Sequence, residues 1–566
     1  MTREDLYIMK NKIKGKPIQI KKSSKQFSAK VVVKSLILTL MIAAILYYLF
    51  FPAINPASHG FWCFLMVLLA FYSTFHMMFA YLDLKELRIK PYLLLLAVLV
   101  LYLGACLLSS KLFNADKYAN VLQVNEEADF VEDMAETVTT DAIALMDTAS
   151  AKMLGDREIG SLSKVVSQYD VSDDYMQIDY QGRPVKVSGL QYSGFLRWFN
   201  NRNEGIPGYV TVDPVSMSAD YHECEGMIYV PSACFGQYLD RHIQMRYSTQ
   251  MLGESHFEID EDGKPFYVCP VYKKTTLLGG KTVKGAIVAD PCSGELTYYP
   301  VEEVPRWVDM VYSGDLLCEQ YNWYGNLKNG FMNSIFGKKG CKRVTEYRSN
   351  VDEDDEEEDA PANDYGYIAK DGDIWIYTGV TSVNKDSSNI GFLLANERTG
   401  EARYYAVSGA DESSAMSAAE GEVQEKGYQA SFPSLINIDG VPTYIMVLKD
   451  NSGMVKLYAT VNVEQYNIVA TAGTQKECIE KYRSLIGASV QTPETDPDNL
   501  QEKVITIAER ELITMAGDTY LYIVTSEQEI FRTGAIGYEG NEKALLLHEG
   551  DTITIRYSGN VIAAWE

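Results

Sequence analysis

Two short motifs combine residue types that could bind a metal ion, but neither supplies a full ligand set. The stretch HECE at 222–225 places a His and a Cys on one face of an extended segment. Two ligands are too few for a zinc site. The stretch EIDEDG at 258–263 has the opening spacing of a calcium loop, but its twelfth position, Cys269, supplies no carboxylate oxygens. We therefore expect no metal site, and we interpret the Asp-Gly pair as a turn.

The usual signatures of catalysis are also incomplete. The stretch LLGGKTVKG at 277–285 resembles part of a phosphate-binding loop, but the first Gly of such a loop would fall on Thr275. Ser-x-x-Lys occurs at 161–164 and 382–385 without the Ser-Asp-Asn and Lys-Thr-Gly partners of penicillin-binding enzymes, and neither GxSxG nor HExxH occurs. We therefore assign no catalytic residue, no cofactor and no metal ligand, and we favour a chain that is not an enzyme.

One aromatic stretch is the candidate for ligand binding. QYNWYGNLKNGFMNSIF (320–336) sets aromatic residues beside several Asn, which suits stacking on sugar rings or contact with a partner protein. The candidate residues are Tyr321, Trp323, Tyr324 and Phe331. The alternative is that these rings pack in a core, as most aromatic residues do.

Three apolar runs precede all of these motifs. Residues about 31–51, 61–82 and 91–110 are each long enough to cross a bilayer core of about 30 Å as a helix. The segment before the first run is strongly basic, the first loop has no Lys or Arg, and the second loop has three. Because positive residues concentrate in cytoplasmic loops, we expect a plasma-membrane protein with a cytoplasmic N-terminus. Residues after about 110 are then extracytoplasmic.

The charge is distributed very unevenly along the chain. Residues 1–34 contain nine Lys and one Arg against two acidic residues, whereas the whole chain has a net charge of −25. Nucleic-acid phosphates would be repelled by most of this surface, so we expect no nucleic-acid partner. The run DEDDEEED (352–359) repels itself and is typical of a solvated linker.

Seven Cys follow the apolar runs, and no two of them form a CxxC pair. This excludes a zinc ribbon and a thioredoxin-type redox motif. Disulfides, such as one between Cys269 and Cys292, and small buried thiols both remain open. An odd count leaves at least one thiol that is free or pairs between chains.

Two stretches share one pattern about a hundred residues apart. GAIVADPCSGELTYYPV (285–301) and GFLLANERTGEARYYAV (391–407) each alternate apolar residues around a short polar segment. This predicts a β-hairpin in both places. Asp290 and Gly294 in the first copy, and Asn396 and Gly400 in the second, are expected to form the turns.

Strand, Asp-Gly or Gln-Gly turn, strand also recurs upstream, and it indicates repeated units. The pattern is QIDYQGRPVKV (177–187), FEIDEDGKPFYV (257–268), YIAKDGDIWIY (367–377) and INIDGVPTYIMVLKD (436–450). At least two copies follow a helix-forming segment, at 231–247 and 410–427. This order of helix, hairpin and a strand ending in D/N-x-x-S/T-G-E resembles the PepSY domain. The resemblance implies small α+β binding or inhibitory modules with no catalytic residues.

The last segment has a different character. Residues 500–566 contain short alternating strands and a Gly-Asp turn, which predicts a small OB-like or SH3-like β-barrel. The expected fold class is a membrane-anchored multidomain α+β protein with three transmembrane helices, repeated helix–antiparallel-sheet units and this barrel. The expected order is a basic tip (1–30), the membrane helices (31–110), a first unit (111–230), a second unit with an aromatic extension (231–345), an acidic linker (346–364), a third, partial unit (365–408), a fourth unit (409–489), a linker (490–499) and the barrel (500–566).

These features favour a non-catalytic binding, scaffold or regulatory protein of the bacterial cell envelope. Its expected partners are the membrane and either another envelope protein or a second copy of the chain, with cell-wall glycan as a further candidate. Two alternatives stay open: an envelope enzyme acting on cell-wall glycan or peptide, and an accessory subunit of a membrane assembly. The enzyme would need converging acids with perturbed pKa values, whereas a binding protein needs shallow surfaces and open strand edges.

Overall fold

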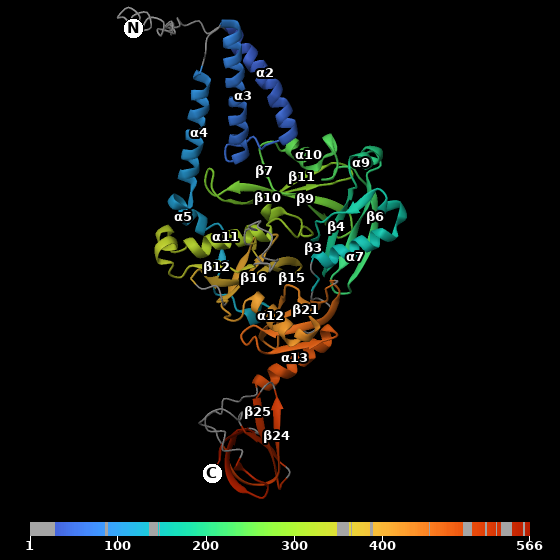
Figure 1. Ribbon diagram of the computed structural model, residues 1–566, viewed down its shortest axis with the longest axis vertical. Coiled ribbons are helices and arrows are strands. Elements are labelled where there is room, and N and C mark those ends of the chain that lie inside the picture. The colour runs from blue at the N-terminus through green and yellow to red at the C-terminus, as the bar shows by residue number, and fades with distance from the viewer. Residues whose placement is uncertain are drawn as a thin grey trace, which may run out of the picture. The chain divides into compact units, whose positions relative to one another are not determined.

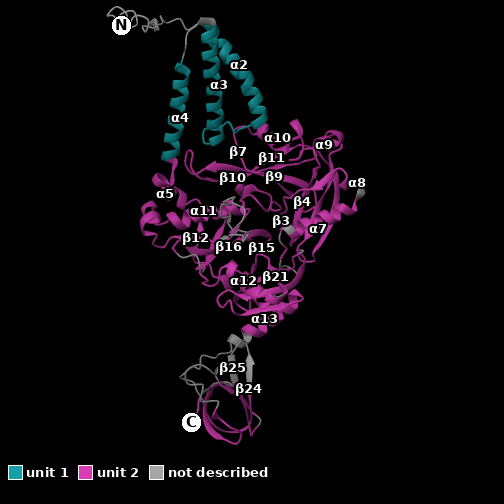
Figure 2. Cartoon of the chain, in the orientation of Figure 1, with its two compact units in different colours: residues 1–108 teal, residues 109–566 magenta. Residues whose placement is uncertain are grey.

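The chain divides into two compact units, Met1–Leu108 and Ser109–Glu566 (Figure 2). The computed structural model describes residues 29–84, 89–134, 145–146, 148–347, 362–363, 365–384, 389–451, 453–490, 501–515, 518–527, 529–533, 546–558 and 561–565. Nearly all of the predicted basic tip and most of the two predicted linkers lie outside these residues.

The first unit contains three long apolar helices, as predicted. They are α2 (Ala29–Phe50), α3 (His59–Leu84) and α4 (Lys90–Ser109, whose last residue belongs to the second unit), and each is long and apolar enough to cross a membrane. A helix satisfies every backbone polar group internally, which a bilayer core requires. The hydroxyls of Ser35 and Thr39 follow the same rule, because each donates to the carbonyl four residues earlier, at 2.7 and 2.8 Å.

Strands make up much of the second unit (Figure 1). They include four antiparallel sheets with the same strand pairing. In each sheet a long strand pairs along one edge with two short preceding strands, and along the other edge with the strand that follows it. Sheet I comprises β2 (Tyr169–Val171), β3 (Met176–Tyr180), β4 (Arg183–Tyr192), β5 (Ile206–Asp213) and β6 (Ser218–Met227). Sheet II comprises β7 (Met251–Leu252), β8 (His256–Ile259), β9 (Pro265–Lys274), β10 (Lys281–Ala289) and β11 (Leu296–Pro300).

Sheets III and IV repeat this arrangement. Sheet III comprises β12 (Lys342–Val344), β15 (Gly366–Lys370), β16 (Asp373–Ser382), β17 (Gly391–Asn396) and β18 (Ala402–Tyr405), and β1 (Val124–Asn125) adds a parallel edge. Sheet IV comprises β19 (Gln429–Ala430), β20 (Ser434–Ile438), β21 (Val441–Lys449), β22 (Val455–Asn462) and β23 (Val469–Ala472). A two-stranded ribbon, β13 (Glu346–Tyr347) with β14 (Ala362–Asn363), lies between β12 and β15 in the sequence.

Short helices connect and cover these sheets. They are α5 (Lys111–Ala119), α6 (Phe130–Asp133), α7 (Thr148–Ser161), α8 (Ser163–Val166), α9 (Phe195–Asn201), η2 (Phe235–Gln237), α10 (Leu239–Arg246), η3 (Val301–Glu303), α11 (Gly314–Leu327), η4 (Asn333–Gly337), α12 (Glu412–Glu422), η5 (Gln424–Lys426) and α13 (Gln475–Val490). The helix of the fourth predicted unit begins with a cap, because Asp411 accepts a hydrogen bond from the Ser414 N–H at 2.8 Å.

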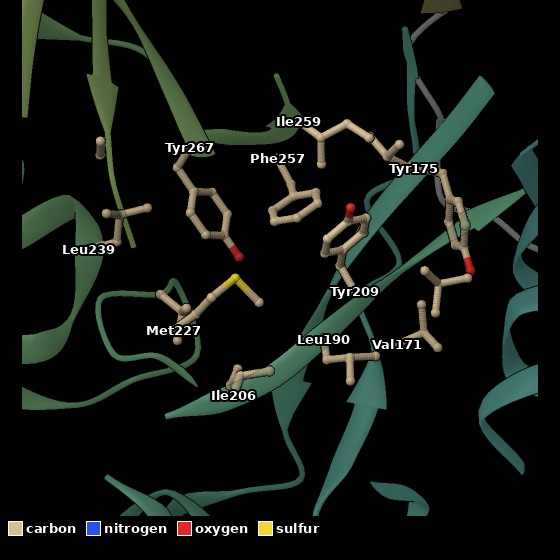
Figure 3. Close-up of a cluster of buried hydrophobic side chains, with 14 of the residues drawn as sticks. Val171, Tyr175, Leu190, Ile206, Tyr209, Met227, Leu239, Phe257, Ile259 and Tyr267 are labelled. Atoms are coloured by element: carbon tan, nitrogen blue, oxygen red, sulfur yellow. The ribbon is translucent and has the colours of Figure 1, made fainter. Parts of the chain in front are cut away.

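The sheets share cores in pairs. Side chains of sheets I and II form one apolar cluster, in which Tyr209 of β5 lies against Phe257 of β8 with ring centroids 5.5 Å apart (Figure 3). Sheets III and IV share another, in which Phe392 and Tyr444 lie 5.9 Å apart edge to face. Residues of α13 cover the second face of sheet IV. Each sheet therefore buries at least one face against another element, as the layers of a folded domain must.

Three of the hairpin turns share one backbone geometry. Gln181-Gly182, Asp371-Gly372 and Asp439-Gly440 have positive φ at both positions. This is the type I′ geometry that suits two-residue hairpins and favours Gly at the second position.

The five C-terminal strands form a separate sheet. They are β24 (Gln501–Met515), β25 (Asp518–Thr525), β26 (Ile530–Thr533), β27 (Thr552–Ser558) and β28 (Val561–Trp565). Their pairing closes into a barrel, with β26 and β28 parallel and the other pairs antiparallel. Closure removes the exposed strand edges that would otherwise pair with another chain.

A glycine pair tests the turn geometry. Gly400 has φ +74°, and a Cβ there would lie 2.8 Å from the ring of Tyr312. We expect Gly400→Ala to lower the free energy of unfolding by about 1–3 kcal/mol. The matched change Gly421→Ala, at a helical position with no heavy atom within 4 Å, should instead raise it by about 0.5–1 kcal/mol. Urea unfolding of the detergent-solubilised protein measures the free energy of unfolding of both variants. Equal effects would contradict the conclusion that the turn at position 400 requires a glycine.

Candidate functional site

The predicted aromatic stretch forms the helix of the third sheet. Tyr321 is buried against sheet III, and Trp323 packs on Tyr118 with ring centroids 5.0 Å apart. Tyr324 and Phe331 are half-buried. The four residues therefore do not form one exposed binding surface. Tyr321 of α11 packs against sheet III, whereas Trp323 packs with Tyr118 of α5. Phe331 lies beyond the end of α11 and packs against the same cluster as Trp323.

The four predicted turn residues lie in the two hairpin turns. Asp290 accepts hydrogen bonds from the N–H groups two and three residues ahead at 2.8 and 3.1 Å, and Asn396 does the same at 2.9 and 2.8 Å. The N–H groups of Gly294 and Gly400 close the turns onto the carbonyls of these residues. All four residues thus shape the backbone locally.

The residues of the metal-like motifs have other partners. His222 stacks on Tyr209 and contacts the hydroxyl of Thr211 at 2.8 Å. Across the described residues, no three His, Cys, Asp or Glu side chains are grouped to hold a metal ion. All nine Cys are free thiols.

A cluster of buried carboxyl groups lies where sheets I, II and III meet. Its centre is Glu258 of β8, which has 0% of its surface exposed. Its carboxylate accepts hydrogen bonds from the backbone N–H groups of Asp309 and Met310 at 2.9 and 3.1 Å, and contacts His256 Nε2 at 2.8 Å. One side chain of sheet II therefore fixes the segment that leads into α11.

The same segment is tied to sheet I. The Asp179 N–H, at the end of β3, donates to Asp309 Oδ2 at 2.7 Å. Burial, and then the charge of Glu258, raise the pKa of Asp309 well above its ordinary value. Burial also raises the pKa of Asp179. Oδ1 of both residues has no hydrogen-bond partner among the described residues.

Sheet III completes the cluster. The backbone carbonyl of Glu397, which follows β17, accepts the N–H groups of Val311 and Tyr312 at 2.9 and 2.7 Å. The side chain of Glu397 is 1% exposed, and burial followed by the charge of Glu258 raises its pKa. Beside it, Arg398 binds Asp373 through two hydrogen bonds of 2.7 Å each.

This burial decides what the carboxyl groups can do. A general acid or base must come within hydrogen-bond reach of its substrate. Glu258, Asp309 and Glu397 are 0, 1 and 1% exposed. Glu258 and Asp309 accept hydrogen bonds from backbone N–H groups of the segment before α11 and of sheet I. These bonds hold parts of the fold together, and the raised pKa values of Asp309 and Glu397 follow first from burial.

An open cavity of about 160 Å³ lies where sheets I, III and IV meet. Most of its wall is apolar or aromatic, and the polar groups include Lys186 of β4 and Gln177 of β3. The Lys186 ammonium is buried and lies 5.8 Å from the centroid of the Tyr367 ring. The lining residues are Leu145, Met146, Thr148, Gln177, Lys186, Tyr365, Gly366, Tyr367, Tyr377, Phe432, Pro433 and Ser434. Such a cavity can hold a small group that is apolar on most sides and anionic at one point.

Neither the cavity nor the carboxyl cluster has a recognisable pattern in the sequence. Gln177 and Lys186 sit in alternating strands, where a polar residue usually indicates the solvent face. Only the packing of strands from different sheets turns them inward, and that packing joins residues more than a hundred positions apart.

Comparisons with known proteins give no family. No family model and no curated protein matches the chain. An ACO/RPE65 chimera and a mutant of Synechocystis apocarotenoid oxygenase are each 8% identical, with a TM-score of 0.15, over 54% of this chain and 62% of theirs. A B. megaterium levansucrase mutant is 9% identical, with a TM-score of 0.17, over 80% of this chain and 97% of its own. Likenesses this weak carry no argument about fold or function.

The carboxyl cluster predicts a large effect of one substitution. Glu258→Ala removes the acceptor of two buried N–H groups and of His256, and we expect it to lower the free energy of unfolding by about 2–5 kcal/mol. The matched change Glu295→Ala, at an exposed residue in the turn between β10 and β11 of the same sheet, should change it by less than about 0.5 kcal/mol. Thermal unfolding of the full chain compares the two, and equal losses would contradict a structural role.

The raised pKa of Asp309 predicts that the stability of the folded protein depends on pH. Because its pKa is raised in the folded state, the folded protein binds more protons than the unfolded chain between the ordinary pKa and the raised one. Its contribution to stability is therefore greatest below the ordinary aspartate range and is lost as the pH rises through the raised pKa. We expect the wild type to lose stability relative to Asp309→Asn across that window, measured by unfolding at a series of pH values. A constant difference between the two proteins would show that Asp309 does not titrate there.

Proposed function

We propose that this chain is a non-catalytic, membrane-anchored binding, scaffold or regulatory protein of the bacterial cell envelope. The three long apolar helices support the anchor. The basic N-terminal segment and the three positive residues of the second loop support a cytoplasmic N-terminus, with the sheets and the barrel outside the cell.

Two features support binding modules as the building blocks. The same strand pairing occurs four times, and α11 and α12 lie on sheets III and IV. This agrees with the helix-and-hairpin pattern of PepSY-like units. The closed five-stranded C-terminal sheet is compatible with an OB-like or SH3-like barrel.

The observation that carries the proposal is the cavity between sheets I, III and IV. Its aromatic wall and its single ammonium suit a carboxylate attached to an apolar group, as at the end of a peptide chain or on an acidic side chain. We infer that an extracytoplasmic segment of another envelope protein inserts such a group there.

An envelope enzyme acting on cell-wall glycan or peptide is the second candidate. The raised pKa values of Asp309 and Glu397 favour it. The burial of both side chains favours binding instead, because a substrate would have to open the junction of three sheets to reach them.

Photocrosslinking from the cavity tests the binding proposal. Thr148 lines the cavity and is exposed, so a benzoylphenylalanine at this position should capture the partner in native membranes without disturbing the core. Lys186→Met keeps the apolar stem and removes the charge, and it should lower the yield of the adduct several-fold because the anionic group loses its counter-ion.

The matched control is the same crosslinker at Ser413, an exposed residue of α12 that does not line the cavity. A protein adduct from position 148 that is weak or missing from position 413 supports the proposal. Equal adducts from both positions, or a yield that Lys186→Met leaves unchanged, would overturn it.

A further inference from the structure

The apolar helix α4 ends in a network of hydrogen bonds. Its last residue, Ser109, belongs to the second unit and is buried there. The Ser109 carbonyl accepts the hydroxyls of Thr276 and Tyr118, both at 3.0 Å, and its own hydroxyl accepts the Leu278 N–H at 3.1 Å. The loop between β9 and β10 is therefore fixed to the residue at which the apolar helix stops.

Two glycines make this close approach sterically feasible. A Cβ on Gly279 would lie 2.1 Å from the Thr276 hydroxyl, and one on Gly280 would lie 2.1 Å from the Trp323 ring. The Gly280 N–H donates to the hydroxyl of Tyr118 at 2.9 Å. This accounts for the Gly pair in the stretch that resembled a phosphate loop: it lets the loop pack against the end of α4.

Several large apolar side chains near Ser109 are exposed on the surface of the second unit. Leu112 and Phe113, in the first turn of α5, are 46 and 58% exposed, and Leu277, beside Leu278, is 55% exposed. A membrane-spanning α4 would place three such side chains, near its end, at the depth where lipid headgroups meet acyl chains. At that depth, lipid would contact these side chains in place of water.

Lysines flank the same apolar side chains. Lys111 precedes Leu112, and Lys273 and Lys281 flank the loop that carries Leu277; all three are exposed. These cations stand out in a chain whose net charge is −25. Glu319 lies near enough for its charge to act on Lys111. Apolar tips with lysines on either side in the sequence match the acyl boundary and the phosphates of an anionic bilayer surface.

We propose that Leu112, Phe113 and Leu277, with the lysines around them, form a lipid-binding surface that rests in the outer leaflet next to the end of α4. The surface holds the start of the second unit at the membrane. It goes beyond the proposed binding function, because its ligand is the anionic bilayer and the cavity between sheets I, III and IV takes no part in it.

Lipid photocrosslinking in nanodiscs tests this surface. The full-length protein carries benzoylphenylalanine at Leu277 or at Phe113, in nanodiscs of phosphatidylcholine with phosphatidylglycerol, and intact-mass spectrometry detects covalent lipid adducts. The matched control is Met454, an apolar residue of similar exposure in the turn between β21 and β22. We expect several-fold more lipid adduct at 277 and 113 than at 454.

Reversing the charge of one lysine tests whether the lysines contribute to binding of anionic lipid. Lys273→Glu, combined with the crosslinker at 277, should lower the adduct in nanodiscs that contain phosphatidylglycerol and leave it nearly unchanged in pure phosphatidylcholine. Adducts at 277 and 113 that do not exceed those at 454 would overturn the proposal. An adduct to a second protein chain in place of lipid, in nanodiscs loaded with several copies, would overturn it as well.

Discussion

The second unit depends on one constraint: a carboxylate removed from water must find hydrogen-bond donors, or it costs several kcal/mol. Glu258 finds them in the backbone N–H groups of Asp309 and Met310, outside its own strand. Asp309 in turn accepts the N–H of Asp179 from sheet I. The path of the chain between sheets II and III is therefore set by the need to satisfy one buried side chain.

The sequence predicted the features that depend on neighbouring residues. The three apolar helices follow from length and composition, and the hairpins at 285–300 and 391–405 follow from alternation and Asx-Gly turn chemistry. The helix α11 was not predicted as a helix, because its Tyr, Trp, Asn and Gly residues have weak helix propensity. Burial against sheet III overrides that propensity. For its aromatic rings the sequence leaves both a binding surface and a core open.

The candidate site could not be predicted for a physical reason. Lys186, Gln177 and Ser434 come from two sheets, and only tertiary packing brings them to one cavity. The carboxyl cluster is similar, since Asp179 and Asp309 are 130 residues apart. Both sites lie where residues of different sheets meet, so no single sheet contains either of them.

The most direct test of this account is the composition of the complex that the full chain forms in its own membrane. Mild extraction followed by native mass spectrometry gives the masses and the ratio of everything that stays bound. The account predicts a second envelope protein at a fixed ratio, and no hydrolysis of cell-wall glycan or peptide by the same sample. A complex of this chain alone that hydrolyses cell-wall material would contradict it, and the buried carboxyl groups would then have to be re-examined as catalytic groups.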